Sequence, residues 1–95
     1  MGQLLSYAKV EDFDRFWATF TSRGAEQRRK FGSRGARVFR SEDDPHEVWV
    51  LFDWEDTERY QEFLNDSTTQ EIFNEAGLQG PPQGRRVREV GTVES

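Results

Sequence analysis

The stretch Glu47-Val-Trp-Val-Leu-Phe-Asp-Trp54 decides the fold of this 95-residue chain. Successive side chains of a strand point to opposite faces of the sheet. One face of this strand therefore carries Val48, Val50, Phe52 and Trp54. The other face carries Trp49 and Leu51, so both faces must be buried. The rest of the chain supplies enough helix for one face only. We expect a second copy of the sheet to cover the other face, which predicts a homodimer.

Composition indicates one small domain with an aromatic core. The chain has a mass of 11.2 kDa and a mean hydropathy of -0.92, yet it contains eight Phe and three Trp. A single core of this size is marginal, so oligomerisation would stabilise it. The chain has no Cys, which excludes disulfides, a thiolate nucleophile and Cys-based metal sites. No run of about 18 apolar residues occurs, so we expect a cytoplasmic protein that does not cross a membrane.

Two stretches with helical periodicity follow the first and third predicted strands. In the first, a stripe at i, i+3, i+4 and i+7 is formed by Phe13, Phe16, Trp17 and Phe20. We expect this helix to continue through Gly24 to about Lys30, where basic residues complement the helix dipole. In the second stretch, Asn65-Asp66 separates a helix carrying Tyr60, Phe63 and Leu64 from a short helix that ends at Gly77.

Four strands are predicted, and together with the helices they define the order of elements. They are Leu4–Val10, Ala36–Ser41, Glu47–Trp54 and Gln83–Val93. The second and third form a hairpin around a polar turn that contains Pro45. The order strand, helix, strand, strand, helix, strand predicts a ferredoxin-like α+β domain over residues 1–95, with an antiparallel sheet and helices on one face.

The chain resembles small proteins of the dimeric α/β-barrel superfamily that are similar to antibiotic-biosynthesis monooxygenases. The residues that carry this resemblance are Phe16-Trp17, Gly24-Ala25 and Arg28-Arg29 on the first helix, Gly35–Arg40 and Asp44-Pro45 in the hairpin, Val48–Phe52, Asp53–Asp56 with Phe63, and Ala76-Gly77 with Gly80-Pro81-Pro82. The likeness spans nearly the whole chain, and its motifs describe a fold rather than a reaction.

The resemblance implies that two protomers pack sheet against sheet and that each keeps a pocket between its own sheet and helices. Members of the superfamily include oxygenases that oxidise quinols or anthrones without metal or flavin, polyketide cyclases of secondary metabolism, and haem-degrading enzymes. Many members have no known activity. The resemblance therefore implies a hydrophobic or aromatic small-molecule ligand, and we expect neither a cofactor nor a metal.

Three residues are candidates for proton transfer. His46 is the only histidine, and its reference pKa lies near neutrality, although a solvated turn residue is the plainer interpretation. Asp53 shares a strand face with Trp49 near the end of a buried strand, where burial would raise the pKa of a carboxyl group. A helix cap or an ion pair with an Arg of the second strand is the plainer interpretation of Asp53. Tyr7 on the first strand is a possible hydrogen-bond donor to a ligand, or a dimer contact.

Aromatic residues are candidates for the walls of the pocket. The predicted pocket-lining residues are Trp17, Phe20, Arg40, Trp49, Tyr60 and Phe63. Arg40 would bind a ligand anion, as Arg37 or Lys9 also would. The alternative is that the aromatic rings fill the core and that the charged groups lie at sheet edges or in the dimer contact.

Charge is distributed unevenly along the chain. Residues 23–40 contain seven basic residues and one acid, whereas residues 42–75 contain twelve acids and one Arg. A basic segment of this kind can bind phosphates. The chain as a whole is acidic, with a pI of about 4.9, and the basic helix end can instead face the acidic helices. We do not expect nucleic acid as a partner.

Two functions from different classes fit these observations. The first is cofactor-independent monooxygenation or cyclisation of an aromatic or polyketide-like molecule. The second is a dimer that binds a ligand or a protein partner without catalysis. No motif specific to one reaction separates them.

Overall fold

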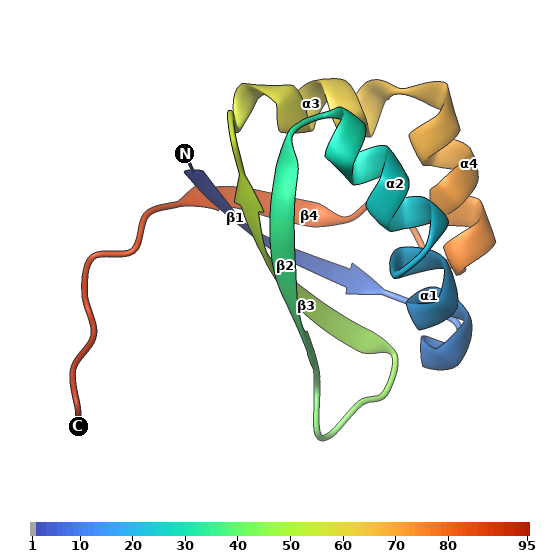
Figure 1. Cartoon of the computed structure of the whole chain (residues 1–95). Coiled ribbons are helices and arrows are strands. Elements are labelled where there is room, and N and C mark those ends of the chain that lie inside the picture. The colour runs from blue at the N-terminus through green and yellow to red at the C-terminus, as the bar shows by residue number, and fades with distance from the viewer. Residues whose placement is uncertain (1) are drawn as a thin grey trace.

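Four antiparallel strands and four helices form the fold in a computed structural model, which describes residues 2–95 (Figure 1). In chain order, the elements are β1 (Gly2–Lys9), α1 (Phe13–Phe20), α2 (Arg23–Lys30), β2 (Ser33–Arg40), β3 (Glu47–Trp54), α3 (Glu58–Asn65), α4 (Ser67–Ala76) and β4 (Gln83–Val87). The strands lie in the order β2-β3-β1-β4, and the helices cover one face of the sheet. The predicted ferredoxin-like α+β fold is confirmed.

Strand β3 lies inside the sheet, between β1 and β2, and its helix-facing side forms the centre of the core. Trp54 is fully buried, and its indole N–H donates to the carbonyl oxygen of Phe31 at 2.7 Å. The rings of Tyr60 and Phe63 on α3 pack against it at centroid distances of 5.2 and 5.4 Å. These edge and tilted contacts are typical of aromatic cores. The predicted division of the two faces of β3 is therefore correct.

Strand β1 presents small side chains to the helices along most of its length. Leu4 is buried, but the next two inward positions are Ser6 and Ala8. Ser6 lies opposite Val50 on β3 and opposite Gly84 on β4. Because inward volume decreases along the strand, space remains between the sheet and the helical layer.

The first helix is not continuous, contrary to the prediction of one helix as far as Lys30. It ends after Phe20, and α2 begins at Arg23. The Thr21 hydroxyl donates to the carbonyl of Trp17 at 2.8 Å, and the Ser22 hydroxyl donates to that of Ala18 at 2.7 Å. Hydroxyl groups that bond back to the preceding turn compete with the helical backbone. The break follows from these two residues.

The last strand is shorter than predicted and ends at Val87 instead of Val93. Val87 lies opposite Gln3, near the beginning of β1, so the partner strand ends here. The chain beyond β4 extends away from the domain (Figure 1), and Val90 and Val93 are 98% and 92% exposed.

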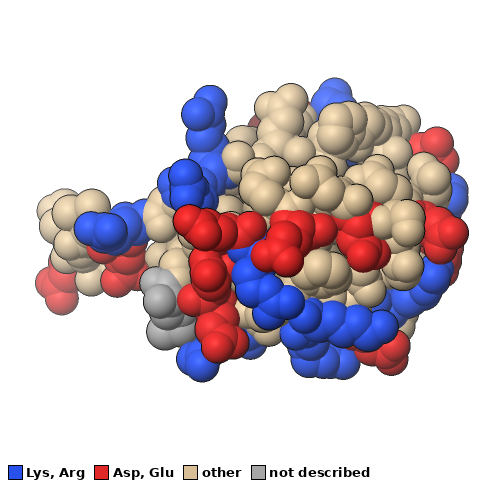
Figure 2. Space-filling view, turned by 90° about the horizontal axis from the view of Figure 1, so that it is seen from above, with Lys and Arg blue, Asp and Glu red and all other residues tan. Residues whose placement is uncertain are grey.

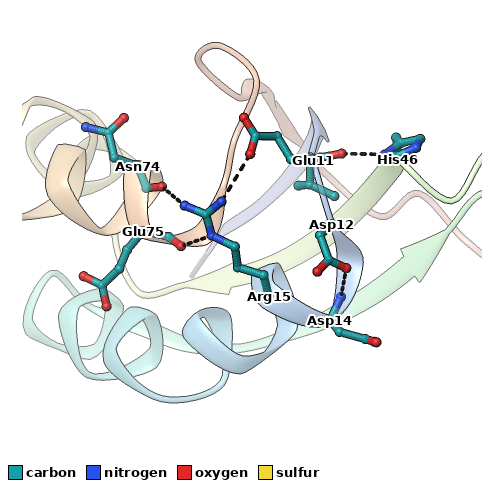
Figure 3. A network of polar contacts seen from close by, with 8 residues as sticks. Glu11, Asp12, Asp14, Arg15, His46, Asn74 and Glu75 are labelled. Carbon is teal, nitrogen blue, oxygen red and sulfur yellow. Dashed lines mark hydrogen bonds and ion pairs between the residues drawn. The ribbon is translucent and has the colours of Figure 1, made fainter.

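One polar network joins the start of α1 to the end of α4 (Figure 3). The Arg15 guanidinium donates to the carbonyls of Asn74 and Glu75 at 2.9 and 2.8 Å, and it pairs with Glu11 at 3.2 Å. These carbonyls belong to the last turn of α4, which ends at Gly77 with φ +76, a conformation that suits glycine. A cation at a helix C-terminus also complements the dipole. Arg15 therefore caps α4 from α1.

Acidic and basic side chains lie side by side on the face seen in Figure 2. Arg23 of α2 pairs with Glu71 and Glu75 of α4, and Arg59 of α3 donates to the carbonyl of Lys30 at 3.1 Å. Part of the basic segment thus faces the acidic helices, as the sequence suggested. Among the described residues, no helix is long and apolar enough to cross a membrane.

We predict that Trp54→Phe lowers the free energy of unfolding by about 1–3 kcal/mol, because it leaves the partly buried carbonyl of Phe31 without its donor. The matched control is Trp17→Phe, since Trp17 is 44% exposed and should cost no more than about 0.5 kcal/mol. Urea denaturation at one protein concentration measures both. Equal costs would show that the hydrogen bond does not stabilise the core.

Candidate functional site

A cavity of about 60 Å³ lies between the sheet and the helical layer. Its walls come from β1 and β3, from all four helices and from the segment that precedes β4. Most lining side chains are aliphatic or aromatic, and among them are Phe20, Phe52, Tyr60 and Phe63. One water needs about 10–15 Å³ in this measure. The cavity therefore has room for a few waters, and an aromatic ring requires lining side chains to move, since a cavity that binds benzene measures about 150 Å³.

Two hydroxyl groups meet on the wall formed by β1 and α3. Tyr60 is only 4% exposed, and its phenol is hydrogen-bonded with the side chain of Ser6. Burial raises the pKa of Tyr60, whereas the hydrogen bond with Ser6 acts in the opposite direction. A Cβ atom at Gly84 would lie 3.2 Å from the Tyr60 oxygen, so the glycine on β4 leaves the space that the phenol occupies.

Arg28 of α2 is the charged residue among those that line the cavity. The residue is 9% exposed, and its guanidinium carbon lies 3.8 Å from the centroid of the Phe20 ring. Its Nη2 donates to the carbonyl oxygen of Phe20 at 2.9 Å. Burial, together with the neighbouring charge of Arg29, lowers the pKa of Arg28 to about 10. The group is therefore still a cation at neutral pH.

Three of the predicted pocket-lining residues, Phe20, Tyr60 and Phe63, line this cavity. The other three lie elsewhere. Trp17 is 44% exposed and stacks on the rings of its own helix, and the Arg40 guanidinium lies 4.6 Å from the Phe13 ring centroid. Trp49 lies on the opposite face of the sheet and is 42% exposed. The face that α1 buries is narrower than the predicted stripe, because Phe16 is buried while Trp17 is exposed.

None of the three candidates for proton transfer lines the cavity. Asp53 is exposed on the open face of the sheet and accepts from the Gln3 side chain at 3.2 Å. Tyr7 also lies on that face and donates to Glu47 at 2.7 Å, and this hydrogen bond is the main cause that raises the pKa of Tyr7. If Asp53 or Tyr7 acts on a ligand, it does so on the open face.

His46 lies in the turn between β2 and β3, where it serves the hairpin. Its Nδ1 is 2.9 Å from the carbonyl oxygen of Val10, a contact visible at the edge of the network in Figure 3. Its backbone N–H donates to the Asp44 carboxylate at 2.9 Å. These contacts fit the plainer interpretation of a turn residue that fastens the hairpin to the end of β1.

A larger hollow of about 1100 Å³ lies between the ends of β1, β3 and β4 and the segment that follows β4. Asp53 lines it together with charged residues such as Glu55 and Arg88. Its walls are polar and include the projecting C-terminal segment, so the smaller apolar cavity is the better candidate for a ligand site. Within residues 2–95, no group of three or more His, Asp or Glu side chains is placed to hold a metal ion.

Sequence reasoning missed Arg28 and Ser6 as members of the site. The sequence assigns Arg28 to the helix dipole, to the basic segment and to the family resemblance, and not to the pocket. A signal was present, since Gly24 and Arg28 are four residues apart and therefore share one helix face, which is the face that turns inward. Ser6 and Ala8 alternate with outward-facing residues in β1, which could have indicated a region of missing inward volume.

Comparison with known proteins gives a result for structure only, because no family model and no curated protein matches the chain. SnoaB, a cofactor-independent oxygenase from Streptomyces nogalater, matches with a TM-score of 0.73 at 13% identity, over 99% of this chain and 97% of that one. The monooxygenase from the gene ActVA-Orf6 of Streptomyces coelicolor, solved with nanaomycin D, matches with a TM-score of 0.66 at 19% identity, over 99% and 91%.

A third match is a conserved protein from Methanosarcina mazei Go1, with a TM-score of 0.66 at 17% identity, over 93% of this chain and 91% of that one. Identities this low show a common fold alone. The expected resemblance is confirmed at that level, and the chain has the fold of the antibiotic biosynthesis monooxygenase-like proteins.

We predict that the pKa of Tyr60 is higher in the folded protein than in the unfolded chain, because burial disfavours the phenolate. The stability that the neutral phenol contributes is present below the unfolded pKa of about 10 and is lost as the pH rises towards the folded value. The chain has two tyrosines, so phenolate absorbance of Tyr7→Phe reports Tyr60 alone. In urea the same variant should titrate near pH 10. An unchanged midpoint on unfolding would contradict the prediction, and Tyr60→Phe serves as the control for Tyr7.

Proposed function

We propose that two copies of this chain associate through their sheets and that each cavity binds an aromatic or polyketide-like ring, with cofactor-independent oxygenation or cyclisation as the reaction. The observation that carries the proposal is the apolar cavity between sheet and helices, with Tyr60, Ser6 and Arg28 as its few polar groups. Sites for small molecules are typically apolar with a small number of placed polar groups. Structural neighbours that include oxygenases support the choice of reaction.

The oxygenation asks little of the protein chemically. An anthrone that has lost a ring-methylene proton to solvent binds as the carbanion, which passes one electron to dioxygen. The radical and superoxide combine to form a carbon–oxygen bond, the resulting peroxide takes a proton back, and loss of water then leaves a carbonyl group. In sum, one methylene and one dioxygen give one carbonyl and one water. The lining residues would hold the ring in place and exclude bulk water from it.

The open face of the sheet supports the dimer. Leu5, Phe39, Trp49 and Val87 are each between 37% and 54% exposed. Strand pairing places them close together, because Tyr7 and Phe39 both lie opposite Trp49, and Leu5 lies opposite Leu51. A contiguous apolar surface of this kind on a small protein marks an interface. A second copy is the simplest partner, since a two-fold axis brings the same surface to both sides.

A second candidate function is binding without catalysis. It is favoured by one observation, which is that among residues 2–95 no carboxylate, imidazole or amine lines the cavity. Among the described lining residues, the usual general bases are represented by the phenol of Tyr60 alone, whose raised pKa keeps it protonated at neutral pH. In this case the ligand would bind with the same affinity whether or not it can be oxidised.

Oxygen consumption separates the two functions. We predict uptake above the uncatalysed rate with at least one member of a panel of anthrones and quinols, and a rise in melting temperature with the same compound. As a control, a narrowing substitution, Ala8→Leu, should reduce both effects, since Ala8 lines the cavity. Stabilisation without uptake across the panel would leave only the binding function. Neither effect would remove this substrate class.

The dimer is tested by a charge on the open face. Leu5→Glu should convert a dimer into a monomer, because the carboxylate would be buried in the interface without a partner. Gln61→Glu, on the exposed surface of α3, introduces the same charge and should leave the mass unchanged. Light scattering coupled to size-exclusion chromatography measures the mass. A wild-type monomer at micromolar concentration would refute the proposed assembly.

A further inference from the structure

Arg28 is a buried cation without a counter-ion. Its residue is nine-tenths buried, its guanidinium lies on the Phe20 ring, and a second ring, that of Phe52, has its centroid 5.8 Å from the guanidinium carbon. The ion pairs among residues 2–95 join Arg15 or Arg23 to glutamates, and none of them includes Arg28. An unpaired buried cation is among the most costly groups that a fold can contain. Aromatic faces offset only part of this cost.

The guanidinium also has unused hydrogen-bonding capacity. An arginine side chain carries five N–H donors, and the structure gives that of Arg28 one acceptor, the carbonyl oxygen of Phe20. The group lines the cavity, so an acceptor placed there can be reached. Arginine binds planar oxyanions well because two parallel N–H groups match two oxygens.

The backbone leaves space for this arrangement at Gly24. A Cβ atom at Gly24 would lie 3.1 Å from Nη1 of Arg28 and 3.0 Å from the carbonyl oxygen of Thr19. A side chain at this position would therefore press on the guanidinium as well as on the α1–α2 junction. Two residues of α2 thus determine where the cation lies: Arg28 carries it, and Gly24 leaves the space beside it.

We propose that the cavity is a site for a single-ring aromatic anion, an aryl carboxylate or phenolate, whose oxyanion binds the guanidinium of Arg28. The proposal rests on the cavity being a ligand site, as proposed above, and does not depend on oxygenation. The volume of about 60 Å³ is smaller than one ring needs, so side chains of the lining move to admit it, and the aromatic and aliphatic lining then fits its faces. The missing counter-ion is then supplied by the ligand.

The test compares ligands of nearly equal shape that differ in charge. Benzoate is paired with benzamide, and 4-nitrophenolate is paired with 4-nitroaniline. Binding is measured by calorimetry, and the site is located by shifts of the Arg28 Nε–H resonance in nuclear magnetic resonance spectra. We expect at least one anion to bind wild type about tenfold or more tightly than its neutral analogue, the effect of one charge-assisted hydrogen bond in a dry site. The pair that shows the preference identifies the oxyanion as carboxylate or phenolate.

Variants locate the source of the preference. Arg28→Met keeps most of the side-chain volume and removes the charge, so the anion and its neutral analogue should bind it with similar affinity. Arg29→Met removes a neighbouring charge of the same helix that is exposed, and it should keep the full preference. Arg28→Lys keeps the charge and removes the planar fork, so it should retain part of the preference. Should Arg28→Met fail to fold, the lysine variant and the Nε–H shifts decide.

Three results would overturn the proposal: equal binding of both members of each pair to wild type, a preference that survives Arg28→Met, or no binding of any probe. Its failure can be told apart from failure of the proposed reaction. Anion preference without oxygen uptake would leave this inference standing and remove the oxygenase. Oxygen uptake without anion preference would do the reverse.

Discussion

The need to cover both faces of β3 governs this structure. The strand lies inside a four-stranded sheet, and its helix-facing residues, from Val48 to Trp54, are buried under helices that come from both halves of the chain. Burying one Trp side chain removes on the order of 150–250 Å² from water. The hydrogen bond from Trp54 to Phe31 then fixes the segment that joins α2 to β2. With the helices used on one side, Trp49 on the other side is left 42% exposed.

The alternation of side chains along the strands and the local signals at helix ends explain which parts of the fold could be predicted from the sequence. Strand faces, the order of elements, the end of α4 at Gly77 and the separation of α3 from α4 follow from local chemistry, and the structure agrees with them. The break after Phe20 depends on two hydroxyl groups that donate to carbonyls of the preceding turn instead of to solvent. The periodicity of apolar residues does not predict these hydrogen bonds. The early end of β4 depends on where β1 begins, which is a property of the assembled sheet.

The candidate site was harder to predict for a physical reason. Aromatic residues at helical spacing identify a core, but a cavity is defined by volume that is missing, and it arises here from Ser6 and Ala8 in β1. Asp53 and His46 are candidates in the sequence because their side chains can transfer protons, yet they lie on the open face and in the hairpin turn. Arg28 gained its significance only from three-dimensional surroundings that contain rings and no carboxylate.

The decreasing side-chain volume along β1 has a consequence for evolution within this fold. Interiors are close-packed, so a position with spare volume can accept a larger apolar residue and gain stability from it. One enlargement at Ser6 or Ala8 would be enough to fill the cavity while leaving the sheet, the helices and the open face as they are. The cavity can therefore be closed by mutation at either of these two positions without loss of the fold.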